Sequence, residues 1–190
     1  MELLEQKIRK EGRVFPGEVL KVDTFLNHQI DVDFLCEVGK EFHRLYCNQN
    51  ITKIFTIEAS GIGVACLTAQ YFHVPVLFAK KSKSSNMAAN AYVSSVESYT
   101  HGQTYDVLVS KEYLKPEDRV LIIDDFLAKG SALRALLDLV SQAGATAVGC
   151  GIVIEKAYQN GGAQLRADGI RVESLAKIAS MSVEDGIKFC

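Results

Sequence analysis

The stretch VLIIDDFLAKGSALRALL, residues 120–137, decides the fold class of this chain. Its apolar start predicts a buried strand, RVLIIDD at residues 119–125, which ends in the adjacent carboxylates Asp124 and Asp125. A short loop follows, and then an amphipathic helix, SALRALLDLVSQAG, which Gly144 ends. A buried strand, a polar loop and a helix in this order are typical of a parallel sheet covered by helices.

The loop AKGSA, residues 128–132, combines small residues, a cation and a hydroxyl directly before the expected helix. Backbone N–H groups and the helix dipole at such a start can bind a phosphate group. Because the strand is expected to end at the acidic pair, Asp124 and Asp125 can both turn toward one ligand and accept hydrogen bonds from ribose hydroxyls. The pair alone fits a solvated loop equally well, but the pair and the loop together favour a sugar-phosphate site.

Segments on both sides of this stretch extend the same architecture. KIFTIE (53–58) and PVLFAK (75–80) read as strands, GIGVACLTAQYF (61–72) between them as a helix, and TAVGCGIVIEK (146–156) as a further strand. A right-handed crossover makes the first two strands parallel, and a helix is expected to begin at the N-cap Asp31. We therefore predict an α/β fold with an open, mostly parallel sheet flanked by helices, which binds ligands beyond the carboxyl ends of its strands.

The chain is predicted to form a single domain, because no repeat, low-complexity tract or proline-rich linker divides residues 1–190. The core is expected at about 31–156, with a small hood lobe formed by about 1–30 and 157–190. Residues 81–104 are polar, small and rich in serine, asparagine and alanine between strand-like segments, and we interpret them as a long mobile hairpin.

A second loop at a strand-to-helix junction is EASGIG, residues 58–63. Its two glycines permit a close backbone approach to an anion at the following helix start, but they fit a tight turn as well. The third glycine of a dinucleotide-binding loop is absent from this segment. Lys80, Lys81 and Lys83 follow the next strand, where they form either a local positive patch or a solvated cluster.

Composition excludes several classes of protein. The chain has the composition of an ordinary globular protein, with 48% hydrophobic and 23% charged residues. Its formal net charge is -2, from 21 basic and 23 acidic residues, so no nucleic-acid partner is expected. Apolar runs shorter than ten residues and a charged N-terminal stretch predict a cytoplasmic protein with no membrane partner. The five cysteines are odd in number and form no Cys-x-x-Cys pair, which predicts reduced thiols.

The segment from Val120 to Ala132 resembles the signature of the type I phosphoribosyltransferases, in which an apolar strand, two acidic residues and two apolar residues precede a small-residue loop. It departs from that signature at Lys129, Ser131 and Ala132. Over nearly its whole length the chain is similar to the xanthine phosphoribosyltransferases of bacterial purine salvage. The segments that carry this wider resemblance are GEVLKVDTFLNHQID, EASGIG, FAKKSKSSNM, DDFLAKGSA and VIEKAYQNGG.

The resemblance implies an enzyme that transfers the phosphoribosyl group of 5-phospho-α-D-ribose 1-diphosphate (PRPP) to xanthine, giving xanthosine 5′-phosphate (XMP) and diphosphate. It implies Mg²⁺ held with the diphosphate, with no metal held by protein side chains alone, and a homodimer. The implied catalytic residues are Asp124 and Asp125. The implied PRPP-binding residues are Ala128, Lys129, Gly130, Ser131, Ala132, Ala59, Ser60, Gly61 and Lys81. The implied xanthine-binding residues are Leu20, Asn27 and Lys156.

Physical roles follow for the three base-binding residues. Lys156, at the carboxyl end of a strand, can donate to a 6-oxo group but not to an amino group, which argues against adenine. Asn27 offers a donor and an acceptor, which suits the 2-oxo edge or a ring N–H, and Leu20 offers apolar cover.

Three alternative functions compete with this interpretation. A guanine or hypoxanthine-guanine phosphoribosyltransferase shares the motifs and stays open. A non-catalytic regulator that senses PRPP is less favoured, because the winged-helix domain of such regulators does not fit in residues 1–30 and the net charge is -2. A phosphoacceptor receiver domain places its acidic pair near the N-terminus and a functional lysine near the end, which is not the order found here.

Overall fold

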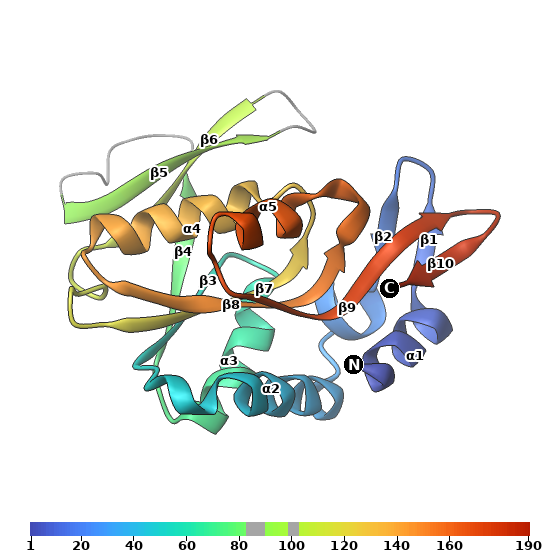
Figure 1. Cartoon of the computed structure of the whole chain (residues 1–190), viewed down its shortest axis with the longest axis horizontal. Coiled ribbons are helices and arrows are strands. Elements are labelled where there is room, and N and C mark those ends of the chain that lie inside the picture. The colour runs from blue at the N-terminus through green and yellow to red at the C-terminus, as the bar shows by residue number, and fades with distance from the viewer. Residues whose placement is uncertain (83–89, 99–102) are drawn as a thin grey trace.

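The computed structural model describes the chain except for residues 83–89 and 99–102. Its main element is an eight-stranded sheet (Figure 1). In spatial order the strands are β10 (Gly186–Phe189), β9 (Val172–Ser182), β8 (Thr146–Lys156), β7 (Arg119–Leu127), β3 (Lys53–Ile57), β4 (Val76–Ser82), β6 (Gln103–Ser110) and β5 (Ala91–Ser98). The strands from β9 to β4 run parallel, whereas β10, β5 and β6 pair antiparallel with their neighbours.

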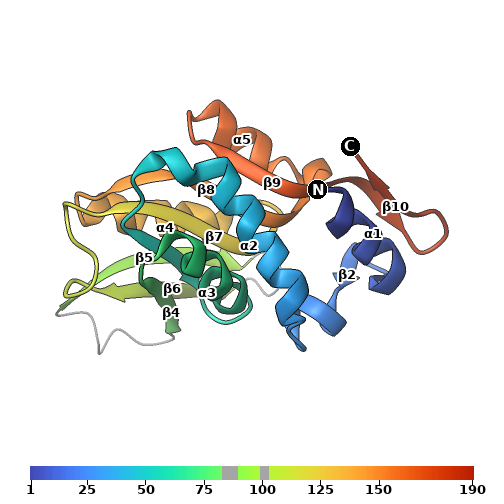
Figure 2. The ribbon, with the colours of Figure 1, turned by 90° about the horizontal axis from the view of Figure 1, so that it is seen from below.

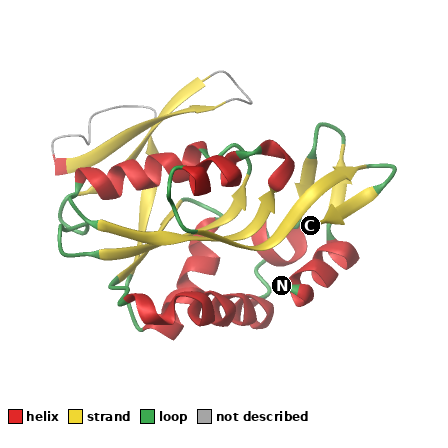
Figure 3. Cartoon of the chain, viewed as in Figure 1, coloured by secondary structure: helices red, strands yellow, loops and turns green. Residues whose placement is uncertain are grey.

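Helices cover both faces of the sheet (Figures 1 and 3). Helices α2 (Val32–Tyr46) and α3 (Gly61–Phe72) pack on one face, and α4 (Ser131–Gln142) and α5 (Gly161–Ala167) on the other. Figure 2, seen from below, shows α2 and α3 lying across the strands. The predicted α/β fold with an open, mostly parallel sheet and helices on both faces is therefore confirmed.

Helix α2 shows how the sequence pattern becomes structure. Asp31 caps the helix, because its side chain accepts a hydrogen bond from the backbone N–H of Phe34. The apolar residues Leu35, Val38 and Phe42 follow at helical spacing, and all three are fully buried in one core cluster. Capping and burial of one face therefore place this helix where the sequence predicts it.

Strand β7 is longer than predicted. It does not stop at Asp125 but continues to Leu127, because Phe126 and Leu127 stay paired with Ile154 and Glu155 of β8. The long neighbouring strand, which continues to Lys156, extends the ladder past the acidic pair. The expectation that the strand ends at the two carboxylates is therefore wrong.

The C-terminal segment also differs from the expected lobe. β9 pairs in parallel with β8 and β10 pairs with β9, so the range 157–190 includes two strands of the main sheet as well as the short helices η4 (Ala157–Gln159) and α5. The far part of β9 and β10 lie with the N-terminal elements at one end of the sheet (Figure 1). Those elements are α1 (Glu2–Glu11), β1 (Arg13–Phe15), β2 (Val19–Lys21) and the π-helix η1 (Asp23–Asn27).

Strands β5 and β6 form an antiparallel hairpin whose pairing runs from Ala91 and Ser110 to Ser98 and Gln103. The hairpin expected at residues 81–104 lies partly on 83–89 and 99–102, outside the described residues. In the described part of the chain, no helix is long and apolar enough to cross a membrane.

Candidate active site

A cavity of about 550 Å³ opens beside the carboxyl ends of β7 and β8. Several elements that are distant in sequence line it, including the β1–β2 turn, the β5–β6 hairpin and the loop between β7 and α4. The lining residues are Gly17, Glu18, Val19, Val96, Tyr105, Asp124, Phe126, Leu127, Ala128, Lys129, Gly130, Ser131, Ala132, Leu133, Lys156 and Gln159. This position matches the rule that open α/β sheets bind ligands outside the carboxyl ends of their strands.

The loop at 128–132, named the phosphate loop here, lies in the cavity wall with all five of its predicted residues. Gly130 has φ +86°, a left-handed conformation that glycine adopts without steric cost, and α4 begins at the next residue. The first turn of a helix carries backbone N–H groups without partners in the helix. The loop and the helix start can therefore hold a phosphate group.

Asp124 is buried, with 4% of its surface exposed, and it lines the cavity. Burial raises the pKa of this carboxyl well above its usual range, and the negative charge of Asp125 raises it further. The backbone N–H of Asp125 donates to Asp124 Oδ1 at 3.0 Å. Asp124 is therefore a desolvated acid in the wall of the cavity, where it can contact a bound ligand.

Asp125 has a different environment. Its Oδ2 accepts a hydrogen bond from Asn27 Nδ2 at 3.0 Å, which links the strand end to the π-helix η1. Asp125 is not among the described residues that line the cavity. Since the strand continues through both carboxylates, the two do not turn together into the cavity, contrary to the geometry expected for a strand that ends there.

The second predicted loop lies behind Asp124. A Cβ atom added to Gly61 would be 3.0 Å from Asp124 Oδ1, which shows how closely the start of α3 approaches this carboxylate. The loop contains a cis peptide bond between Glu58 and Ala59, and Glu58 Oε1 accepts a hydrogen bond from the backbone N–H of Lys81 at 2.6 Å. Ala59, Ser60, Gly61 and Lys81 are absent from the described lining of the cavity.

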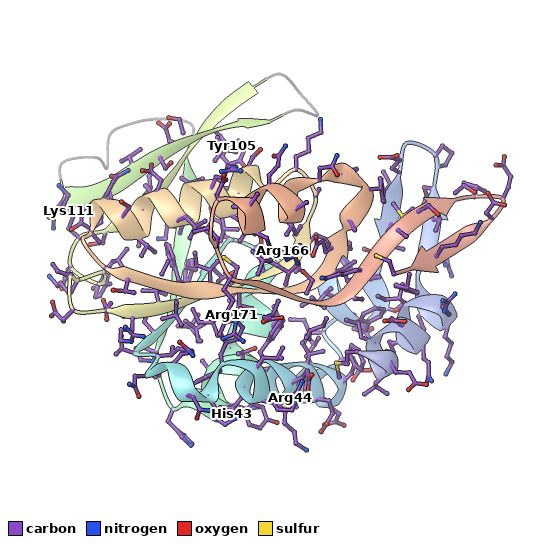
Figure 4. All side chains as sticks on the ribbon, in the orientation of Figure 1. His43, Arg44, Tyr105, Lys111, Arg166 and Arg171 are labelled. Atoms are coloured by element: carbon purple, nitrogen blue, oxygen red, sulfur yellow. The ribbon has the colours of Figure 1, made fainter. Side chains whose placement is uncertain are left out.

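Lys81 nevertheless contacts the site through Tyr105. Its Nζ lies 5.8 Å from the centre of the Tyr105 ring, and its charge lowers the pKa of Asp124 against the larger effect of burial. Burial and then the charge of Asp124 raise the pKa of the Tyr105 phenol. Figure 4 labels Tyr105 on the hairpin above α4.

Lys156 lies at another part of the cavity wall, at the end of β8. Its Nζ donates to the backbone oxygen of Glu18 at 2.7 Å and lies 5.9 Å from the centre of the Phe126 ring. Burial lowers the pKa of this ammonium group. Gln159 Nε2 of η4 donates to Glu18 Oε2 at 2.9 Å, so the β1–β2 turn is bound both to the end of β8 and to η4.

The other two residues predicted to meet the base are placed differently. Leu20 is 7% exposed and belongs to the core cluster under α2 and α3, whereas its neighbour Val19 lines the cavity. Asn27 is exposed and is absent from the described lining, but its bond to Asp125 keeps it next to the site.

Sequence reasoning missed several lining residues, among them Glu18, Phe126, Tyr105 and Gln159. Phe126 and Gln159 lie within motifs that the sequence singled out, so their position next to other site residues was a usable signal. Glu18 also lies within a quoted segment, GEVLKVDTFLNHQID, but the turn that carries it approaches the cavity only in the folded chain. Tyr105 comes from a hairpin outside those segments, and no local pattern marks it.

The acidic pair is the feature of the described site that suits a metal ion. Among the described residues, no group of three or more His, Cys, Asp or Glu side chains could hold a metal. The Asp124–Asp125 pair offers oxygen atoms, the ligand type that Mg²⁺ prefers, and Mg²⁺ is commonly bound by one or two carboxylates together with phosphate oxygens of a substrate. The acidic pair therefore fits an ion that a bound diphosphate largely holds.

Comparison with known proteins agrees with this geometry. The chain is 59% identical over 186 residues to the xanthine phosphoribosyltransferase of Lachnoclostridium phytofermentans, covering 98% of this chain and 96% of that protein. It is 58% identical over 181 residues to that of Ruminiclostridium cellulolyticum, covering 95% of each. Among solved structures, the adenine phosphoribosyltransferase of Rhodothermus marinus superposes with a TM-score of 0.75 at 24% identity, covering 93% of this chain and 98% of that one, which shows the shared fold.

The model of the phosphoribosyl transferase domain matches residues 24–172. This range contains the acidic pair, the phosphate loop and Lys156, so the match covers the part of the chain that forms most of the cavity. The resemblance to phosphoribosyltransferases seen in the sequence is thereby confirmed, and the chain belongs to the phosphoribosyltransferase family.

Proposed function

We propose that the protein is a xanthine phosphoribosyltransferase, which transfers the 5-phosphoribosyl group of PRPP to N9 of xanthine and releases XMP and diphosphate. The observation that carries this proposal is that one cavity combines a phosphate loop, a buried carboxylate and a lysine suited to a 6-oxo group. The names of the relatives that are 59% and 58% identical to the chain support xanthine as the base.

At the phosphate loop, the chain holds the 5′-phosphate of PRPP. The backbone N–H groups of residues 130–132 and the Ser131 hydroxyl are donors that face this group, and the start of α4 adds the positive end of its dipole. Ala59, Ser60, Gly61 and Lys81 serve the diphosphate of the same substrate from the start of α3 and the end of β4. Binding both ends of PRPP fixes the ribose between them.

At the ribose, the bond from C1′ to the diphosphate oxygen breaks and the bond from C1′ to N9 forms. Positive charge develops on the ribose ring during the exchange. Asp124 stabilises it from the cavity wall once the cations that accompany PRPP have displaced the proton of this buried acid. Asp125, held by Asn27 beside the cavity, adds its negative charge. The N9 proton of xanthine passes to solvent water, and diphosphate departs as the second product. When bound, Mg²⁺ neutralises the charge of the leaving diphosphate.

At the base, Lys156 donates to the 6-oxo group of xanthine. Its ammonium has three N–H donors, of which one binds Glu18 in the structure, so donors remain for the substrate. Asn27, whose Nδ2 is bound to Asp125, offers its Oδ1 and its second N–H to the opposite edge of the purine. Phe126, close to Lys156, provides an apolar surface beside the base.

The test of this proposal is product identification by chromatography. Purified protein incubated with xanthine, PRPP and Mg²⁺ is expected to form XMP and an equal amount of diphosphate. Omission of PRPP or chelation of Mg²⁺ with EDTA is expected to stop the reaction, because the leaving diphosphate then keeps its full charge. Tight binding of PRPP without any nucleotide product would instead indicate the non-catalytic PRPP sensor.

We also propose a cytoplasmic homodimer that pairs through the outer part of the sheet near β4 and β6. An apolar cleft of about 380 Å³ lies there, and it includes the exposed side chains of Phe78 and Tyr113. Lys80 also lines this cleft, so pairing would bring a second subunit close to the lysines of β4. Large exposed apolar side chains next to each other are a common feature of subunit interfaces.

Light scattering is expected to give about twice the chain mass of 20.9 kDa. Phe78→Asp is expected to shift the mass toward the monomer, because it places a charge in the apolar cleft. Val183→Asp is the matched control, since Val183 is 60% exposed and lies on the turn between β9 and β10. A monomeric parent with full activity would contradict the proposed dimer.

A further inference from the structure

A buried ion pair connects α5 to the end of β8. Glu155 is 2% exposed, and both of its oxygens are bound by Arg166, with Nη1 to Oε1 at 2.9 Å and Nη2 to Oε2 at 2.7 Å. Ser174 Oγ also donates to Glu155, and Arg166 Nε donates to the backbone oxygen of Val172 at 3.1 Å. A planar guanidinium bound at two points and by a third contact has little freedom to move.

Helix α5 is held in position by tertiary contacts, of which this pair is one. It has only seven residues and begins with two glycines, so it is too short to be stable by itself and must be held by tertiary contacts. Leu165, which is 1% exposed, supplies an apolar contact, and Arg166 supplies a buried polar one. At the other end of the helix, Asp168 forms an ion pair with Arg134 of α4, with 2.9 Å between Oδ2 and Nη2. With these contacts, the start of α5 packs between β8 and the phosphate loop.

The start of α5 touches the backbone of the phosphate loop. Gly161 N–H donates to the backbone oxygen of Ala128 at 3.2 Å, and a Cβ atom on Gly161 would be 2.2 Å from that oxygen and 2.5 Å from the carbonyl carbon of Lys129. On the other side, a Cβ atom on Gly162 would be 2.0 Å from Glu155 Oε1. The two glycines are therefore packed between the Glu155 carboxylate and the loop, with no room for a side chain.

We propose that Arg166 and Glu155 are positioning residues for the phosphate loop. Among the described lining residues neither one appears, so the pair acts on PRPP through α5 and the Ala128–Gly130 backbone. The inference rests on the proposed function in one respect, which is that the loop holds the 5′-phosphate. Loss of the pair lets α5 withdraw from the loop, and a small displacement of phosphate-binding N–H groups weakens binding of PRPP strongly.

Kinetics of Arg166→Met, with Arg171→Met as the matched control, test the proposal. Figure 4 shows the two arginines on opposite sides of the sheet, and Arg171 stacks on Tyr46 at 4.2 Å and donates to the backbone oxygen of Leu45. Arg166→Met is expected to raise the KM for PRPP by about 10- to 100-fold and to change the KM for xanthine by less than about threefold. Arg166→Lys is expected to recover part of the loss, because an ammonium keeps the charge but not both contacts. Arg171→Met is expected to keep the parent KM for PRPP.

A second variant, Gly161→Ala, and calorimetric binding of PRPP test the same contact independently. Gly161→Ala alters the same contact without touching the ion pair, and it is expected to raise the KM for PRPP as well, because its Cβ would displace the loop. Calorimetric binding of PRPP separates this inference from the choice of base, since weaker binding in Arg166→Met supports it even if xanthine is not the substrate. The positioning role would be overturned by an unchanged PRPP affinity in folded Arg166→Met and Gly161→Ala. It would also be overturned by equal losses of affinity for PRPP and xanthine. A parent protein that binds no PRPP would overturn it together with the proposed function.

Discussion

Asp124→Asn is expected to lower kcat/KM for phosphoribosyl transfer by about 10²- to 10³-fold, the usual effect of removing one group that stabilises a developing charge. The substitution keeps the shape of a side chain that is buried in the cavity wall, so folding is expected to survive. Asp138→Asn is the control, because this carboxylate on α4 is exposed, accepts a hydrogen bond from Gln142 and does not line the cavity. Turnover of Asp124→Asn close to that of the parent would remove Asp124 from the mechanism.

The same variant is expected to be more stable than the parent at neutral pH. Burial and the charge of Asp125 raise the pKa of Asp124 in the folded chain, so the folded state keeps a proton that the unfolded state has already lost. The free energy of unfolding of the parent therefore falls as pH rises above the unfolded value of about 4, and the penalty stays in place above the folded pKa. Urea unfolding between pH 4 and 8 is expected to show a smaller decline for Asp124→Asn. An identical pH dependence in both proteins would contradict the buried acid.

Lys156→Met is expected to lower kcat/KM for xanthine by about 30- to 1000-fold, because the 6-oxo group loses a charge-assisted hydrogen bond in a desolvated site. The change for adenine is expected to be small, since its amino group gains nothing from an ammonium donor. Lys21→Met is the control, because this exposed lysine of β2 stacks on Phe15 away from the described cavity lining. Equal losses for all purines in Lys156→Met would show that the lysine holds the β1–β2 turn through Glu18 rather than selecting the base.

The sequence predicts the fold well where a pattern is local. Asp31 and the apolar face of α2, and the run of buried residues in β7, follow from capping and hydrophobic spacing alone. The end of β7 does not, because Phe126 and Leu127 stay extended only through pairing with β8. β9 was missed for a similar reason, since its mixed sequence VESLAKIASMS becomes a strand by pairing with β8.

The sequence predicts part of the candidate active site. The phosphate loop and Asp124 come from one continuous motif, and the structure brings them into one cavity with Lys156. The bond between Asn27 and Asp125 and the contact of Glu18 with Lys156 join residues about 100 positions or more apart, and such contacts follow only from the packing of the N-terminal elements against the sheet. The roles of the individual residues stay predictions that the variants above test.

The most direct test of the proposed function is kcat/KM for xanthine, guanine, hypoxanthine and adenine, each measured with saturating PRPP and Mg²⁺. Xanthine is expected to rank first and adenine last. Adenine is expected to be lower by about 30- to 1000-fold, because its 6-amino group offers no acceptor to the Lys156 N–H donors that remain for the base. Guanine well above xanthine would identify a guanine-preferring enzyme on the same fold. Adenine ranking first would contradict the role of Lys156 and with it the proposed function.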